Sequence, residues 1–212
     1  MTAHGRLLLV RHAQTAGNRA RRRMGREDLP LDCVGVQQAD ELASTLETVI
    51  PSGAPLTVHS SPLLRATQTI APFATARGLR VHVDPDLVEM DFGSADDGAE
   101  PRRKLRLKKQ HLYDPLPGGE SLFHVWQRAV RFFARVQPQL TSGGTVLVVS
   151  HYRTSQHLAG VAAGKDFETD VRTNRFKPAN ASLSVMRFAA AGQVDGPFAL
   201  WSPPTAPVPE PD

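Results

Sequence analysis

The sequence predicts an α/β fold with a largely parallel central sheet. Short apolar runs alternate with longer segments in which apolar residues recur every three or four positions, a pattern typical of strands alternating with packed helices. Residues 146–149 are continuously apolar, which indicates a strand covered on both faces. A chain of 212 residues can bury a core without disulfides or metals. We therefore expect one domain over residues 1–200.

The expected strands are short and end at polar or turn residues. Residues 7–10 run directly into Arg11 and His12, and residues 80–83 end at an Asp-Pro-Asp turn. Residues 182–188 alternate between apolar and polar side chains, which predicts a half-buried strand. The full set of predicted strands is 7–10, 56–60, 80–83, 146–149 and 182–188.

Helices are predicted where apolar residues recur at helical spacing, over residues 35–50, 63–76, 120–136 and 154–163. Ser61 and Pro62 offer a cap and a first-turn proline for the second of these helices. Residues 93–119 are rich in glycine, proline and basic residues, so we expect an excursion with at most a short helix. Residues 201–212 are proline-rich, and we expect a disordered tail there.

Composition excludes several classes of protein. The single cysteine, Cys33, can form neither an internal disulfide nor a thiolate metal cluster, so a cytoplasmic location is expected. The N-terminus lacks the apolar core of a signal peptide, and no apolar run is long enough to cross a bilayer. The net charge is +4, but aromatic residues make up only 6% and do not interleave with the basic ones. We expect an anionic small molecule as partner, with no nucleic acid and no membrane, and we leave a homodimer open.

Two histidines follow predicted buried strands. His12 comes after residues 7–10, and His151 after residues 146–150. Ligands bind open α/β sheets beyond the carboxyl ends of the strands, so both imidazoles are expected to face one crevice.

The residues around these histidines form ordered motifs. The chain carries RHAQTAGN at 11–18, SSPLLRATQT at 60–69, LVEMDFG at 87–93, PGGES at 117–121 and VVSH at 148–151, followed by Asn180. Together these motifs resemble the signatures of the histidine phosphatase superfamily, the phosphoglycerate mutase-like family, over residues 6–188. The resemblance implies a three-layer α/β/α sandwich and an enzyme that passes through phosphohistidine.

The resemblance also assigns roles in phosphoryl transfer. It implies that His12 is the nucleophile, attacking as a neutral imidazole whose other nitrogen donates to a backbone carbonyl. It implies that Arg11, Arg65 and His151 surround the nonbridging oxygens as three convergent cations, with the amide of Asn18 as a further donor. These groups neutralise charge directly, so we expect neither a cofactor nor a metal.

Two glutamates match motif positions of the family. Glu89 has the family position of the general acid, which protonates the leaving alcohol and then activates water. Glu120 is interpreted as structural, because it lies at the start of a predicted helix where a carboxylate satisfies amide donors.

Departures from the family pattern concern substrate choice. Tyr152 follows His151 where glycine is usual, so its ring is a candidate substrate contact, although it could merely pack. Basic runs lie at 19–26 and 102–109. Charge runs are usually solvated, but these two follow the catalytic motifs, and Arg21, Arg22 and Arg102 are candidate contacts to a second anionic group.

The function predicted from the sequence is hydrolysis of a small anionic phosphate monoester through phosphorylated His12. The segment between Glu89 and Pro117 is short, which favours a phosphatase over a phosphoglycerate mutase, the alternative within the family. A noncatalytic member that binds phosphorylated ligands is a second alternative, and nucleic-acid binding through the arginines is a third.

Overall fold

A computed structural model describes residues 5–93, 109–189 and 194–203. The predicted excursion over 93–119 therefore lies partly outside the described residues, as do the basic run at 102–108 and most of the expected tail. No helix in the described part of the chain is long and apolar enough to cross a membrane.

The described residues form a six-stranded sheet with the strand order β3-β2-β4-β1-β5-β6. The strands are β1 (Gly5–Arg11), β2 (Leu56–Ser60), β3 (Val81–Val83), β4 (Thr145–Ser150), β5 (Leu183–Phe188) and β6 (Val194–Trp201). Neighbouring strands from β3 to β1 pair in parallel, while β5 and β6 are antiparallel. The prediction of a largely parallel sheet is confirmed.

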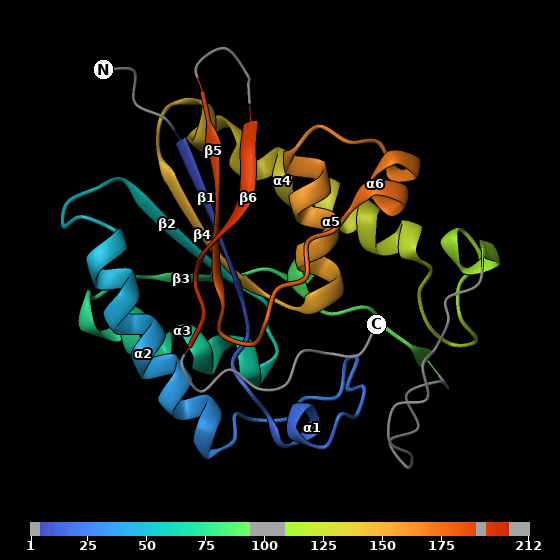
Figure 1. Cartoon of the computed structure of the whole chain (residues 1–212), viewed down its shortest axis with the longest axis horizontal. Coiled ribbons are helices and arrows are strands. Elements are labelled where there is room, and N and C mark those ends of the chain that lie inside the picture. Colours follow the sequence, from blue (N-terminus) through green and yellow to red (C-terminus); the bar gives the residue numbers. More distant parts are fainter. Residues whose placement is uncertain (1–4, 94–108, 190–193, 204–212) are drawn as a thin grey trace.

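Helices cover both faces of the sheet and make three layers (Figure 1). They are α1 (Ala16–Arg19), α2 (Cys33–Val49), α3 (Leu64–Ala76), α4 (Leu122–Thr141), α5 (Tyr152–Ala162) and α6 (Phe167–Thr173), with 3-10 turns η1 (Pro85–Leu87) and η3 (Lys109–Leu112). Strand β1 explains the layering, since its side chains alternate between faces. Leu7 and Leu9 pack into a core with α4 and α5, whereas Leu8 and Val10 pack into a core with α2 and α3.

The start of α3 differs from the prediction. The cap position is Leu63 and has no side-chain cap bond, so Ser61 is not the cap. The amide of Leu64, the first helical residue, donates instead to Oδ1 of Asp28 at 2.6 Å, a carboxylate from a distant loop. The Ser61 hydroxyl, just after β2, accepts from the amide of Leu63 at 3.3 Å instead.

Two further differences concern the C-terminal part of the sheet. Strand β5 is buried at every position but Arg187, not half-buried, because its side chains pack alternately into the cores on the two faces of the sheet. Strand β6 was not predicted and includes Trp201, at the first position of the expected tail. Trp201 is partly buried against the core on the α2 and α3 side. Residues 204–212 lie outside the described residues.

Candidate active site

The carboxyl ends of β1, β2 and β4 meet at one edge of the sheet. In the parallel register Arg11 pairs with Ser150, and Ser60 with Val149. The amide of His12 donates to the carbonyl of Ser150 at 2.9 Å. The His12 and His151 rings are consequently close neighbours, with centroids 5.1 Å apart. The expectation that both imidazoles lie together agrees with this geometry.

The hydrogen bond of His12 defines which ring nitrogen can attack. The side chain is 2% exposed, and its Nδ1 lies 2.7 Å from the carbonyl oxygen of Ala13. A carbonyl can only accept, so Nδ1 carries the proton and the lone pair of the neutral ring is on Nε2. This is the tautomer that a nucleophile needs.

The backbone around His12 is fixed by side chains from distant elements. The amide of Ala13 donates to Oγ1 of Thr69 at 2.8 Å, and Thr69 in turn donates to the carbonyl of Arg65 at 2.6 Å. Nδ2 of Asn180 donates to the carbonyl of His12 at 2.9 Å. Because both sides of the ring-bearing residue are held, the orientation of the imidazole is preorganised.

Arg65 is the more deeply buried of the two arginines predicted to bind phosphate, at 1% exposure. Its Nη1 and Nη2 donate to the carbonyls of Glu27 and Gly25 at 2.6 and 2.7 Å, and its Nε donates to Nδ1 of His151 at 3.3 Å. Arg11 is also buried, and its Nη1 donates to the carbonyl of Pro178 at 3.1 Å. Neutral backbone carbonyls therefore hold the guanidinium groups of Arg65 and Arg11 in place without cancelling their charge.

His151 differs from the sequence-based picture of three convergent cations. Burial, followed by the charge of Arg65, lowers the pKa of His151 well below its ordinary value of 6.5. A guanidinium can only donate, so Nδ1 of His151 accepts from Arg65 and Nε2 donates to Oγ of Ser61 at 2.8 Å. The ring is therefore neutral, and the site presents two guanidinium cations and a polar imidazole.

Asn18 lies in the short helix α1 behind His12. Its Oδ1 accepts from the amide and hydroxyl of Thr15 at 3.2 and 3.0 Å and from Nδ2 of Asn180 at 3.3 Å. Its own Nδ2 is buried and has no hydrogen-bond partner. A buried amide donor without an acceptor is costly, which fits the expectation that Asn18 donates to a bound anion.

Glu89 follows Val88, the residue that ends η1, and its carboxylate lies at the N-terminus of α5. It is 9% exposed. Its Oε1 accepts from the amide of Met90 at 2.8 Å and its Oε2 from the amide of Arg153 at 3.3 Å. His151 is the cap residue of the same helix, so the candidate acid and His151 share one helix terminus.

Of the proposed substrate contacts, Tyr152 lies beside the site. The guanidinium carbons of Arg11 and Arg153 lie 5.2 and 5.5 Å from its ring centroid. Arg22 already pairs with Glu27 at 2.9 Å, on the surface, while Arg21 is exposed at a positive φ of 54°. Arg102 lies outside the described residues.

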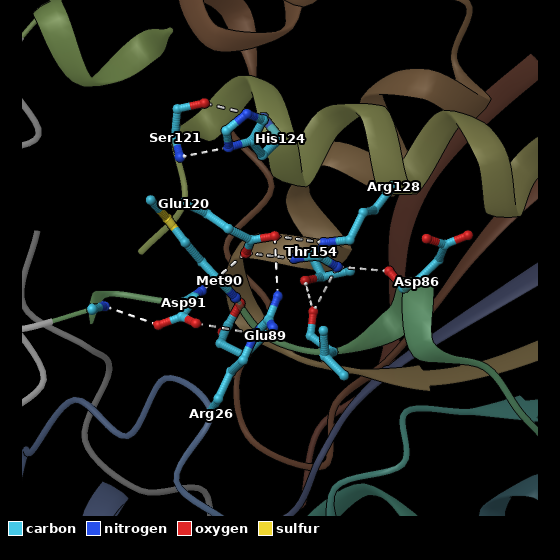
Figure 2. Close-up of polar contacts among 12 residues, drawn as sticks. Arg26, Asp86, Glu89, Met90, Asp91, Glu120, Ser121, His124, Arg128 and Thr154 are labelled. Carbon is cyan, nitrogen blue, oxygen red and sulfur yellow. Dashed lines mark hydrogen bonds and ion pairs between the residues drawn. The ribbon is translucent and has the colours of Figure 1, made fainter. Parts of the chain in front are cut away.

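Glu120 is structural, as interpreted, but for a different reason. It precedes α4, whose cap is Ser121. Its carboxylate bonds to Arg128 of α4 and accepts from the amide of Asp91 at 3.0 Å, so it does not cap the helix (Figure 2). Burial raises the pKa of Glu120, but the hydrogen bonds and charge of Arg128, the amide of Asp91 and the charge of Arg26 together hold the pKa below its ordinary value of 4.5.

Sequence reasoning missed two side chains that organise the site. Ser61 was taken for a helix cap, and Asn180 was noticed only as part of a motif; neither was named as a site residue. The signal for both was present, since each belongs to one of the ordered motifs. In the parts of the chain that the structure describes, no group of three or more histidine, cysteine, aspartate or glutamate side chains is arranged to hold a metal ion.

Comparison with known proteins identifies a family whose signature motifs include His12, Arg65 and His151. The model of the histidine phosphatase superfamily, branch 1, matches residues 7–194. The chain belongs to this superfamily. Members bind phosphorylated small molecules, and the chain is a histidine phosphatase-family enzyme.

The curated relatives include a mycobacterial bifunctional protein and probable phosphoglycerate mutases. A bifunctional protein of Mycobacterium tuberculosis is 38% identical over 195 residues, which cover 88% of this chain and 51% of that protein. The chain thus spans about half the length of that relative. A probable phosphoglycerate mutase of Yersinia enterocolitica is 31% identical over 153 residues, 68% of each chain.

Solved structures include named phosphatases. The alpha-ribazole phosphatase from Shigella flexneri is 26% identical with a TM-score of 0.69, covering 89% of this chain and 93% of that one. Mycobacterial glucosyl-3-phosphoglycerate phosphatase in complex with VO3 is 25% identical with a TM-score of 0.66, covering 86% and 92%. The fold of the histidine phosphatase-family enzymes is therefore shared over nearly the whole chain.

Proposed function

We propose that this protein is a phosphomonoesterase that hydrolyses a small anionic phosphate ester through phosphohistidine on His12. The single observation that carries this proposal is the hydrogen bond from Nδ1 of His12 to the carbonyl of Ala13, at 2.7 Å. It leaves the lone pair on Nε2 of a ring that neighbours His151. A solely structural histidine would not require this tautomer beside two buried arginines.

In the first step Nε2 of His12 attacks phosphorus, and the bond from phosphorus to the leaving oxygen breaks. Glu89, protonated, gives its proton to the departing oxygen, so the product is a neutral alcohol. In the second step Glu89 takes a proton from water as the water oxygen attacks phosphohistidine. Inorganic phosphate leaves and the imidazole of His12 is restored.

Arg11 and Arg65 supply the charge that binds the phosphoryl group. One pair of unit charges 4 Å apart contributes about 4 kcal/mol at an effective dielectric of 20, so two guanidinium groups suffice for a dianion. His151 contributes as a neutral polar group, and the unpaired Nδ2 of Asn18 is a further donor. On this basis we propose catalysis without a metal or cofactor.

The choice of phosphatase rests on the short segment between Glu89 and Pro117 and on the phosphatases among the structural neighbours. Phosphoglycerate mutase is the second candidate, favoured by the name of the Yersinia relative. Incubation with a phosphoglycerate separates the two, because a phosphatase releases inorganic phosphate and a mutase produces the isomer. A noncatalytic phospholigand-binding protein would do neither.

The wider proposal is one catalytic domain over residues 1–200 in the cytoplasm. Its natural substrate is to be sought with a panel of sugar phosphates, phosphoglycerates and nucleotides.

The test of the mechanism is His12→Ala. Turnover of every substrate in the panel should be lost, together with the acid-labile label that a radioactive phosphate ester leaves on the protein. His82→Ala is the matched control, since His82 is an exposed histidine on β3. Activity that survives in the His12→Ala protein, with its fold intact by circular dichroism, would refute the proposal.

A further inference from the structure

Arg128 of α4 holds the backbone that precedes Glu89. Its side chain is 9% exposed. Nη1 donates to the carbonyls of Asp86 and Val88 at 2.7 and 3.0 Å. Nε and Nη2 donate to the two carboxylate oxygens of Glu120 at 2.9 and 3.0 Å (Figure 2). One guanidinium therefore joins a carboxylate to two carbonyls of the segment that carries the candidate acid.

Glu120 extends this connection to the other side of Glu89. Its Oε2 accepts from the amide of Asp91 at 3.0 Å. Its Oε1 also pairs with Nη2 of Arg26 at 3.1 Å, and Figure 2 shows Glu120 between the two arginines. The carboxylate is thus fixed by charge from two elements while it holds an amide two residues after Glu89.

Side chains from β4 and α5 hold the same segment. Oγ of Ser150 donates to the carbonyl of Leu87 at 2.8 Å, and Oγ1 of Thr154 donates to the carbonyl of Val88 at 2.6 Å. These two bonds fix the segment against the strand and helix that carry His151. The Arg128–Glu120 pair fixes it from the start of α4, and unlike Ser150 and Thr154 it has bonds on both sides of Glu89.

We propose that Arg128 and Glu120 are positioning residues that set where the carboxyl group of Glu89 lies relative to the leaving oxygen. This inference rests on the proposed function, in which Glu89 is the general acid. Proton transfer requires the donor within hydrogen-bond reach of the acceptor. The carboxyl group of Glu89 is otherwise held by the amides of Met90 and Arg153, which follow the position of the backbone.

Stability alone does not account for this pair. Apolar residues of similar volume often stabilise a fold as well as a buried ion pair does, because the charges must be taken out of water. What apolar residues cannot supply is directed donors to two carbonyls and an acceptor for an amide. The pair supplies all three to residues 86–91, the segment around Glu89.

The test is Arg128→Lys, assayed with an alkyl phosphate and with p-nitrophenyl phosphate. Lysine keeps the charge but cannot serve both carboxylate oxygens and both carbonyls at once. With the acid misplaced, kcat for the alkyl phosphate should fall by about 10-fold to 100-fold. The loss for p-nitrophenyl phosphate, whose leaving group needs no proton, should stay below about threefold.

Arg131→Lys is the matched control. Arg131 lies on the same helix and contacts the same residue, Asp86, but through the side-chain Oδ1 at 2.7 Å and on the surface. This variant should leave kcat for both substrates unchanged. A selective loss in Arg131→Lys would assign the effect to any guanidinium contact with Asp86 and overturn the positioning role.

Glu89→Gln separates failure of the inference from failure of the proposed function. If Glu89→Gln slows both substrates equally, Glu89 is not the general acid and the proposed function is wrong in that respect. If Glu89→Gln is selective but Arg128→Lys slows both substrates equally, or neither, the positioning role is overturned. In a protein that carries both Glu89→Gln and Arg128→Lys, kcat for the alkyl phosphate should fall no further than in Glu89→Gln alone. Additive losses in kcat would contradict the inference.

Glu120→Gln keeps the test available if Arg128→Lys fails to fold. Glutamine has nearly the same shape and retains an oxygen for the amide of Asp91, but it gives Arg128 one acceptor in place of two. We expect kcat for the alkyl phosphate to fall selectively in this variant too. Its circular dichroism spectrum should match that of the unchanged protein. An unselective loss, or none, in folded Glu120→Gln would overturn the proposal.

Discussion

Acid should destabilise this protein well above the pH at which its carboxylates become protonated. Burial lowers the pKa of His151 well below 6.5, and burial together with His82 lowers that of His59 from 6.5 to about 4. Each histidine therefore binds its proton more weakly in the folded chain than in the unfolded one. Stability is complete above about pH 6.5 and is lost as the pH falls below it.

The loss of unfolding free energy follows from the difference between the assay pH and pH 6.5, the ordinary pKa of histidine. At pH 5 a histidine with a strongly lowered pKa costs at most about 2 kcal/mol of unfolding free energy, at about 1.4 kcal/mol per pH unit. His151 is fully buried and should approach this limit. His59 is partly exposed and faces Asp84 and Arg135 as well as His82, so screening reduces its share to about 1 kcal/mol. The sum is about 3 kcal/mol.

Urea unfolding between pH 7.5 and pH 5 measures this loss. The carboxyls with lowered pKa values do not interfere, because Asp86, Asp166 and Glu120 have ordinary values of 3.8, 3.8 and 4.5 and lose their contribution only below these. His59→Gln should reduce the pH dependence by about a third. An unfolding free energy that is flat from pH 7.5 to pH 5 would refute the assignment of His151 as neutral.

Three other outcomes are expected. Activity should survive a chelator, since the proposed charge neutralisation uses arginines; loss with EDTA and recovery with a divalent ion would require another mechanism. Gly35→Ala should lower the melting temperature and kcat, because its Cβ would meet the carbonyl oxygen of Gln14 at 2.0 Å and overpacking costs about 1–3 kcal/mol; exposed Ser44→Ala on α2 is the control. Neutralising Arg21 and Arg22 should raise KM only for substrates with a second anionic group, and an equal effect on p-nitrophenyl phosphate would show that these arginines are solvated surface.

Much of the fold was predictable because apolar runs and helical periodicity report burial directly. Strand β2 has the predicted bounds, and β4 extends the predicted strand by one residue at each end. Strand β6 was not predictable in this way, since Gly196 and Pro197 argue against a strand and proline is tolerated only at an edge. Helix α6 is short and buries only Phe167 and Asp170, too few residues for a periodic stripe.

The candidate site divides along similar lines. The positions of His12 and His151 followed from their places after buried strands. The neutral state of His151 did not, because it depends on burial against Arg65, which is 86 residues away in sequence. The partners of the basic run at 19–26 could not be predicted either, because they are distant in sequence. Arg26 pairs with Glu120 only in the folded chain.

The bond from Asn180 to the carbonyl of His12 has a consequence for biosynthesis. These residues are 168 positions apart, and the neighbouring amide of Ala181 donates to the carbonyl of Arg11 at 3.0 Å. A nascent chain that ends before Asn180 contains every proposed catalytic residue but lacks the two bonds from Asn180 and Ala181 to the backbone at His12 and Arg11. Such distant contacts form slowly, so the proposed phosphatase activity should appear only after β5 has left the ribosome and paired with β1, late in the maturation of the polypeptide.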